Sequence, residues 1–200
     1  MQLAQAISDI RTVRPPSART ETPDSALIEA IVTGDGHAMH VLFARHSARV
    51  YRFILRLTRR ESLAEELLNE VFIEAWRQAG KFEGRSQVST WLLGIARYKA
   101  LNAMRLRQDE ALDETALAQI EDPADSAEIV VVQADRASHL RRCLGQLSPA
   151  HREIIDLVYY HEKSVAEASE IVGVPPGTVK TRMFHARKRL AELLKAAGVN

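Results

Sequence analysis

Residues 164–194 constrain the fold most, because they read as two helices joined by a tight turn. Ser164 and Glu167 have the spacing of a capping box, which predicts a helix start, and Gly173 predicts the end of that helix. A pair of prolines follows, and proline is tolerated at the start of the next helix because its missing N–H would have no partner there. The stretch therefore predicts a helix-turn-helix.

The second of these helices has two chemically different sides. Val179, Met183, Ala186 and Leu190 recur at helical spacing and predict one buried face. The outward residues are Gly177, Thr178, Lys180, Thr181, Arg182, Phe184, His185, Arg187, Lys188 and Arg189. No acid interrupts this segment, so we expect a recognition helix in the major groove, with cations on phosphates and central residues on base edges. The alternative is a solvated basic face on an ordinary terminal helix.

The charge is unevenly distributed, although the net charge of the 200 residues is only +1. Residues 24–106 hold 12 basic and 9 acidic side chains, and residues 129–200 hold 11 and 7. Between them, residues 107–128 hold one arginine and eight acids. This pattern predicts two mildly basic blocks joined by an acidic linker, with residues 1–23 as a disordered tail.

The first block reads as a series of helices. A helix from Asp24, with Asp24 as its cap, is followed by one over residues 37–58, whose Arg45, Arg49, Arg52 and Arg56 form a basic stripe. We interpret that stripe as a solvated face. Ser62 and Glu65 predict a capping box for a helix to residue 79, with a buried face and an opposite acidic face. The predicted buried residues are Leu67, Leu68, Val71, Phe72, Ala75 and Trp76, and the acidic face holds Glu66, Asn69, Glu70 and Glu74.

A polar loop at residues 81–89 leads to a helix over residues 90–106 that mixes aromatic and basic side chains. Such a mixture suits unpaired bases, since rings stack on base faces and cations meet the backbone. Trp91 at the helix start is also a candidate for the core. In the second block we expect helices over residues 129–147 and 149–160, the latter begun by Ser148 and Pro149, before the helix-turn-helix. The predicted fold class is all-α, with two small helical domains joined by a flexible linker.

Composition and motifs exclude several classes of function. No segment is long and apolar enough to span a bilayer, and the single cysteine, Cys143, excludes an intrachain disulfide and fits a reducing compartment, so we expect a cytoplasmic chain without membrane insertion. No phosphate-binding glycine loop or hydrolase motif occurs. His37 with His40, and His139 with Cys143, lack a third ligand, so we predict no metal, no cofactor and no enzymatic activity.

Several stretches together resemble the extracytoplasmic-function (ECF) sigma factors of bacterial RNA polymerase, over about residues 24–194. The family's region 2.2 is resembled by LAEELLNEVFIEAWRQAGKF, its regions 2.3 and 2.4 by KFEGRSQVSTWLLGIARYKALNAMR, and its region 4 by LSPAHREIIDLVYYHEKSVAEASEIVGVPPGTVKTRMFHARKRL. The resemblance implies a non-enzymatic subunit that directs core polymerase, through its β′ and β subunits, to promoter DNA. It assigns residues 24–106 to region 2, residues 107–128 to the linker and residues 129–200 to region 4.

The resemblance also implies roles for particular residues. The β′ contact falls on Glu66, Asn69 and Glu70. Contacts to the −10 element fall on Lys81, Phe82, Arg85, Trp91, Arg97, Tyr98, Lys99 and Asn102. Contacts to the −35 element fall on Thr178, Lys180, Thr181, Arg182, Phe184, His185, Arg187 and Lys188. His185 stands where the family commonly has arginine, which alters the expected base preference because histidine lacks arginine's bidentate fork.

Members of the family are usually controlled by an anti-sigma factor, often in a stress response, and we expect such a partner here. The alternative from a different class is a stand-alone, dimeric helix-turn-helix regulator. It would bind a palindromic operator tightly without polymerase, whereas a sigma factor would need polymerase and an asymmetric, bipartite site.

Overall fold

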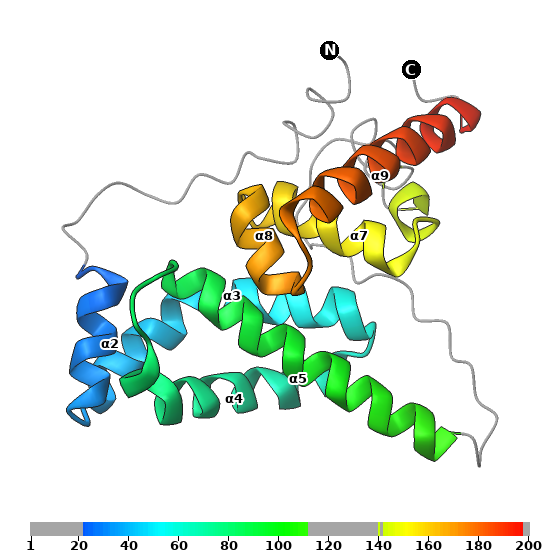
Figure 1. Cartoon of the computed structure of the whole chain (residues 1–200). Coiled ribbons are helices and arrows are strands. Elements are labelled where there is room, and N and C mark those ends of the chain that lie inside the picture. The colour runs from blue at the N-terminus through cyan, green and yellow to red at the C-terminus, as the bar shows by residue number, and fades with distance from the viewer. Residues whose placement is uncertain (1–21, 112–139, 141, 198–200) are drawn as a thin grey trace, which may run out of the picture.

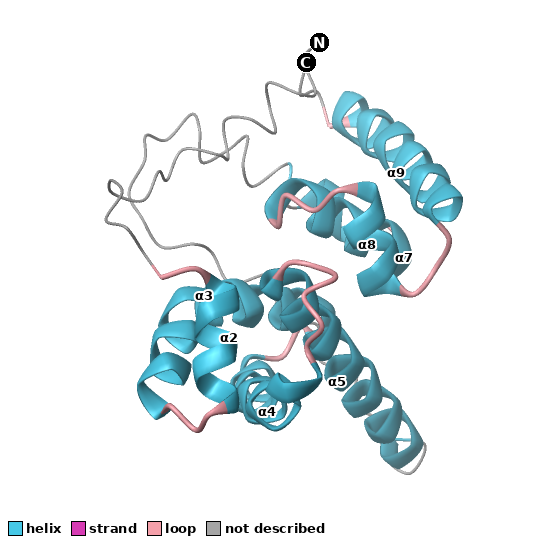
Figure 2. Cartoon of the chain, turned by 60° about the vertical axis from the view of Figure 1, so that its left-hand side comes forward, coloured by secondary structure: helices cyan, strands magenta, loops and turns pink. Residues whose placement is uncertain are grey.

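The computed structural model describes residues 22–111, 140 and 142–197, and every helix or strand assigned in these ranges is a helix. Figures 1 and 2 show two helical groups that lie against each other. The first module, residues 22–111, contains α2 (Asp24–Val32), α3 (Gly36–Thr58), α4 (Glu61–Gln78), the short 3-10 helix η2 (Ala79–Lys81) and α5 (Val88–Ala111). The second module, residues 140–197, contains α7 (Pro149–Ile155), the π-helical turn η3 (Asp156–Tyr160), α8 (Val165–Val172) and α9 (Pro176–Ala196). The expected all-α fold is confirmed.

Parts of the predicted organisation lie outside the described residues. These parts are nearly all of the tail at 1–23, most of the linker at 107–128, and most of the helix expected at 129–147, of which 142–145 are helical. The helix predicted for residues 90–106 begins earlier, at Val88, and continues to Ala111.

Two of the predicted helix caps in the first module are wrong. Asp24 is the first residue of α2, not its cap, and its carboxylate instead pairs with Arg45 and His46 of α3. The helix α4 begins at Glu61, so Ser62 lies inside its first turn and makes no capping box. By contrast, α3 is capped by Asp35, whose side chain accepts hydrogen bonds from the next backbone N–H groups. Because its carboxylate is paired with residues of α3, Asp24 does not act as the helix cap that the local sequence suggested.

The core of the first module lies between α3, α4 and α5. The buried residues of α3 include Leu42, Val50, Phe53 and Ile54, those of α4 include Leu67, Val71 and Phe72, and those of α5 include Leu92, Leu93, Ala96 and Ala100. Trp76 was expected to be buried and is 40% exposed. It lies about 100° around α4 from the buried Ala75, at the edge of the packed face.

The arginine stripe of α3 is not uniformly solvated, contrary to the sequence interpretation. Arg49 and Arg52 are exposed, but Arg45 pairs with Asp24 and Arg56 pairs with Asp156 of the second module. The guanidinium of Arg56 also lies 3.9 Å from the ring centroid of Tyr160. Hence one end of the stripe holds α2 and the other end holds η3.

The second module follows its predicted start and stop signals closely. Ser148 caps α7, and Pro149 is the first residue of that helix. The capping box of Ser164 and Glu167 is complete, and Gly173 ends α8 with a φ of 70°, a conformation that L side chains rarely adopt. The helix expected to run to residue 160 instead changes at Ile155 into the π-helical turn η3.

The two modules share one continuous hydrophobic core. Ile154, Leu157, Ala168, Ile171 and Val172 of the second module belong to the same buried cluster as the residues of α3, α4 and α5. The sequence predicted modules that act on separate stretches of DNA, and direct packing between them was not expected. This packing determines which functional residues are accessible.

Folding stability should depend on pH through His46, whose Nε2 lies 2.7 Å from a carboxylate oxygen of Asp24. Burial lowers the pKa of His46 below its ordinary value of 6.5, although Asp24 acts in the opposite direction. The unfolded chain therefore binds a proton more readily, so the free energy of unfolding should fall as pH drops below about 6.5, by less than about 1.4 kcal/mol per pH unit. Urea unfolding at pH 5.5 and 7.5 measures this fall.

His46→Gln should reduce the difference in unfolding free energy between pH 7.5 and pH 5.5, because an amide can still donate to Asp24 and does not titrate. His40→Gln removes an exposed histidine of the same helix and should leave the difference unchanged. If His46→Gln and the unaltered chain show the same pH dependence of stability, then His46 is not its source.

Candidate nucleic-acid interface

The outward face of α9 presents all eight residues predicted for duplex contact. Val179, Ala186 and Leu190 are buried against the rest of the second module, and Met183 is half-buried. Lys180, Thr181, Phe184, His185, Arg187 and Lys188 are exposed, and Thr178 and Arg182 are half-buried. The α-helical spacing inferred from the sequence is therefore observed, and the face is open to a partner.

Aromatic rings lie at the centre of this face. Phe184 is 60% exposed, and its ring centroid lies 5.4 Å from that of His185. The His185 ring stacks at 6.4 Å on His151, which comes from the first turn of α7. Sequence reasoning missed His151, since only the packing of α7 on α9 brings it there. An exposed phenylalanine beside two imidazoles offers apolar contact and hydrogen bonding to base edges.

The loop before α5 and the first turns of that helix hold a second group of predicted contacts. The rings of Phe82 and Trp91 lie 5.0 Å apart between centroids, and both are half-buried. Lys81, the last residue of η2, and Arg85, in the loop that follows, are both exposed, and Arg85 pairs with Glu83. Tyr98 is 68% exposed, two turns after Trp91 on the same side of the helix.

Two of the predicted cations on α5 already have carboxylate partners. Arg97 donates from Nε to Glu153 of the second module at 2.6 Å, and Lys99 donates to Glu70 of α4 at 3.0 Å. Asn102 is half-buried one turn beyond Tyr98. The structure thus separates the predicted set into accessible groups and groups that must exchange partners before binding DNA.

A groove of about 590 Å³ runs beside these residues, between α4, α5 and α8. It is lined by Glu74, Gln78, Thr90, Trp91, Gly94, Ile95, Tyr98, Lys99, Glu170 and Ile171. Trp91, Tyr98 and Lys99 were predicted, whereas Glu170 and Ile171 come from the second module. Part of the wall beside the predicted −10 residues is therefore supplied by the module assigned to the other promoter element.

The acidic face of α4 is accessible and includes an apolar residue. The side chains of Glu66 and Glu70 are 60% and 45% exposed, and Asn69 is also exposed. Ile73 follows at helical spacing and is 51% exposed. Sequence reasoning missed Ile73, although its three-residue step from Glu70 was a usable signal. The face therefore offers both carboxylates and one apolar side chain to a protein partner.

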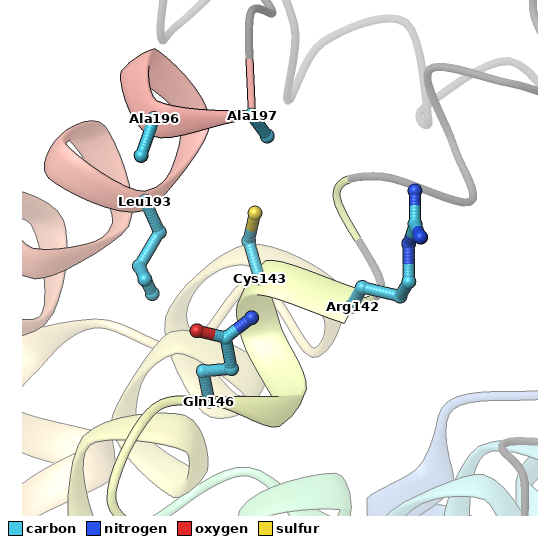
Figure 3. Close-up of a pocket in the computed structure, with 6 residues that line it drawn as sticks. All are labelled: Arg142, Cys143, Gln146, Leu193, Ala196 and Ala197. Atoms are coloured by element: carbon cyan, nitrogen blue, oxygen red, sulfur yellow. The ribbon is translucent and has the colours of Figure 1, made fainter.

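The remaining candidates do not form a site. Among the residues that the structure describes, no group of three or more His, Cys, Asp or Glu could hold a metal ion, and no helix could cross a membrane. His139 lies outside the described residues. Figure 3 shows the sulfur of the buried Cys143 directed toward the end of α9, in a pocket of about 380 Å³ that also includes Leu193. This pocket lies at the C-terminal end of α9, beyond the outward residues 178–188 of the same helix.

Two family models match the chain. The model described as Sigma-70 region 2 matches residues 42–110, and the model described as Sigma-70, region 4 matches residues 139–190. The matches cover α4, α5, α8 and most of α9, which are the helices that carry both candidate DNA-contacting groups and the acidic face.

Curated relatives and a solved structure agree with these models. The ECF RNA polymerase sigma factor SigM of Mycobacterium tuberculosis is 35% identical over 177 residues, which is 88% of this chain and 87% of SigM. The RNA polymerase sigma factor CarQ of Myxococcus xanthus is 34% identical over 84% of this chain and 95% of CarQ. The sigma factor RpoE from Bartonella quintana, solved in complex with the anti-sigma factor NepR, has a TM-score of 0.65 and 28% identity over 78% of this chain and 96% of that chain.

The exposed Phe184 should contribute little to folding, in contrast to the buried Val179 of the same helix. Phe184→Ala should change the free energy of unfolding by less than about 0.5 kcal/mol, because most of the ring is already exposed and little buried apolar area is lost. Val179→Ala should cost about 2 kcal/mol through lost burial and a residual cavity. Urea unfolding of both variants tests the orientation of α9, and equal destabilisation would show that the face is misassigned.

Proposed function

Because the chain belongs to the ECF RNA polymerase sigma factors, we propose that it directs core polymerase to promoters with a −35 and a −10 element and assists melting of the duplex. One observation carries the proposal. The chain combines three chemically distinct surfaces and has no enzymatic motif. These surfaces are the outward face of α9, the aromatic and basic residues around α5, and the acidic and apolar face of α4. Sigma factors are non-enzymatic initiation factors, so chemistry remains with the polymerase.

The outward face of α9 would read the −35 element in the major groove. Lys180, Thr181, Phe184 and His185 lie in the N-terminal half of the helix, where recognition helices contact base edges. Arg187 and Lys188 lie further along and would meet phosphates, which position the helix without specifying sequence. Many members of the family have an arginine at the position of His185, and arginine can make a bidentate contact to guanine. His185, which stacks on His151, would instead make a single hydrogen bond or a stacking contact.

The region around α5 would bind the −10 element as it opens. Phe82, Trp91 and Tyr98 offer ring faces to unstacked bases, and each such stack is worth about 1 to 3 kcal/mol. Lys81 and Arg85 supply accessible cations for the backbone. Arg97, Lys99 and Asn102 would join them after the carboxylates that now hold the two cations are displaced.

The face of α4 formed by Glu66, Asn69, Glu70 and Ile73 would dock on the β′ subunit of the polymerase, while the second module would contact β. Carboxylates around an exposed apolar residue suit a partner that presents cations around an apolar centre, since complementary charge orients the approach and apolar burial supplies affinity.

An anti-sigma factor is the natural inhibitory partner under this proposal, because the related RpoE was solved with one. Such a partner would act in the cytoplasm, where transcription occurs, and a stress signal would release the chain. The competing reading, a stand-alone dimeric regulator, predicts tight binding to a palindrome. Run-off transcription decides between them: initiation by core polymerase only when this chain is added supports the sigma role, and failure on every promoter of its own genome removes it.

Lys180→Ala and His185→Ala should each reduce use of the −35 element by about 1 to 3 kcal/mol if the residue reads a base. Run-off transcription from promoters with single −35 substitutions measures the loss and the altered preference. Lys195→Ala removes an exposed cation near the end of the same helix and serves as the control. Unchanged promoter preference in both test variants would remove the recognition role of α9.

Glu66→Lys and Ile73→Ser should each weaken binding to core polymerase, about threefold to tenfold, because they remove charge complementarity or apolar burial from the docking face. Glu66 is altered rather than Glu70 because its contact with Arg107 is long, at 3.9 Å, whereas Glu70 pairs with Lys99 at 3.0 Å. Glu29→Lys, at an exposed site on α2, is the matched charge reversal. Equal co-purification of all variants with core polymerase would disprove the docking face.

A further inference from the structure

The ring of His185, on the outward face of α9, contacts two other rings. Its centroid lies 5.4 Å from that of Phe184, with the ring planes at 76°, and 6.4 Å from that of His151, with the planes at 24°. Both separations lie within the range in which aromatic side chains attract each other. His185 is exposed, so without such neighbours its side chain would exchange between staggered rotamers. The two contacts therefore restrict the orientation of an exposed imidazole.

The packing of α7 on α9 places His151 beside His185. His151 lies in the first turn of α7, where its backbone N–H donates to Ser148 Oγ at 3.3 Å. Ile155, one turn later on the same side of α7, is buried in one cluster with Ala186, the residue that follows His185. Because Ala186 carries only a methyl group, the two helices approach closely there. The contact that buries Ile155 thus also sets the position of the His151 ring.

Other polar groups near this ring pair already have partners. Thr181, one turn before His185, donates its hydroxyl to a backbone carbonyl of its own helix at 3.0 Å. Arg152, next to His151, donates to two backbone carbonyls that precede α7, at 3.0 and 3.1 Å. Within the described part of the chain, the ring nitrogens of His151 and His185 have no hydrogen-bond partner. The imidazole of His185 is therefore available to a base edge.

The orientation of this imidazole affects which base it can select. Each base pair presents a different pattern of donors and acceptors in the major groove, and a hydrogen bond weakens steeply when it is bent. A ring held in one orientation therefore satisfies one base pair better than the others, whereas a mobile ring adjusts to several. A ring that is ordered before binding also loses less conformational entropy when it meets the DNA.

We propose that His151 is a positioning residue for −35 recognition, which holds the imidazole of His185 in the orientation that selects one base pair. The inference rests on the proposed function for the identity of the DNA element. It extends the recognition unit beyond the helix-turn-helix to α7, where no residue was predicted to take part. The role requires the ring of His151 and its contact with His185, and it requires no contact of His151 with DNA.

Full-length variants separate positioning from other roles. His151→Ala removes the ring, His151→Phe keeps a ring without nitrogen atoms, and His185→Ala removes the group that is positioned. A double variant combines the two alanine substitutions. His40→Ala removes an exposed histidine of α3 and is the matched control. Circular dichroism and urea unfolding establish that each variant is folded.

Each protein is combined with core polymerase, and run-off transcription is measured from promoters that carry every single base-pair substitution of the −35 element. We expect the unaltered chain and His40→Ala to favour one base pair at a position where His185→Ala loses the preference. His151→Ala should reduce that preference at least threefold and change the preferences at other positions less than twofold. His151→Phe should retain it. The double variant should match His185→Ala, since a positioning residue has no effect without the group that it positions.

Unaltered preferences in His151→Ala would overturn the proposal, and so would a preference that survives in His185→Ala. An equal loss at every position, or a further loss in the double variant relative to His185→Ala, would assign His151 to phosphate contact or to stability instead. Loss of the preference in folded His151→Phe would show that the ring contact is not its source.

The same measurements separate this failure from failure of the proposed function. Initiation by the unaltered chain, with none of the expected effects in the variants, removes the positioning role alone. Absence of initiation by the unaltered chain on every promoter of its own genome removes the sigma role, and the inference with it.

Discussion

The ion pair of Lys163 and Glu167 is the interaction on which the arrangement of this molecule depends most. Glu167 caps α8, which starts the helix-turn-helix, and it also holds Lys163 and Thr90 at the boundary with the first module. One carboxylate thus contributes to local helix formation and to the packing of the modules. An isolated buried ammonium would be costly, so the same partners that make the cluster tolerable also fix where the second module sits.

Sequence reasoning found the helices because their buried faces repeat at helical spacing, and it found the capping box at Ser164 and the stop at Gly173 because both signals are local. It failed where a side chain had a better distant partner. Asp24 is a residue type that commonly caps helices, yet its carboxylate pairs with Arg45 and His46 on the next helix. Competition between local and tertiary hydrogen bonds is not readable from spacing alone.

The candidate site shows the same contrast between features set by local sequence and features set by tertiary packing. Exposure of Phe184 and His185 follows from the spacing of Val179, Ala186 and Leu190 on one helix, so α9 could be oriented from sequence. His151 reaches His185 only through packing, and Arg97 finds Glu153 across 56 positions of the chain. Neither pairing produces a periodic pattern in the sequence. The exposed face of α9 was therefore predictable, whereas the internal partners of its neighbours and of the cations on α5 were not.

The internal pairing of charges explains why net charge says so little about this chain. Arg56, Arg97 and Lys99 would each add to a basic surface if counted from sequence, but each faces a carboxylate of the same molecule. A phosphate therefore competes with an internal acid rather than with water. The pairs of Arg56 and Arg97 cross between the modules, whereas Lys99 has its partner, Glu70, within the first module.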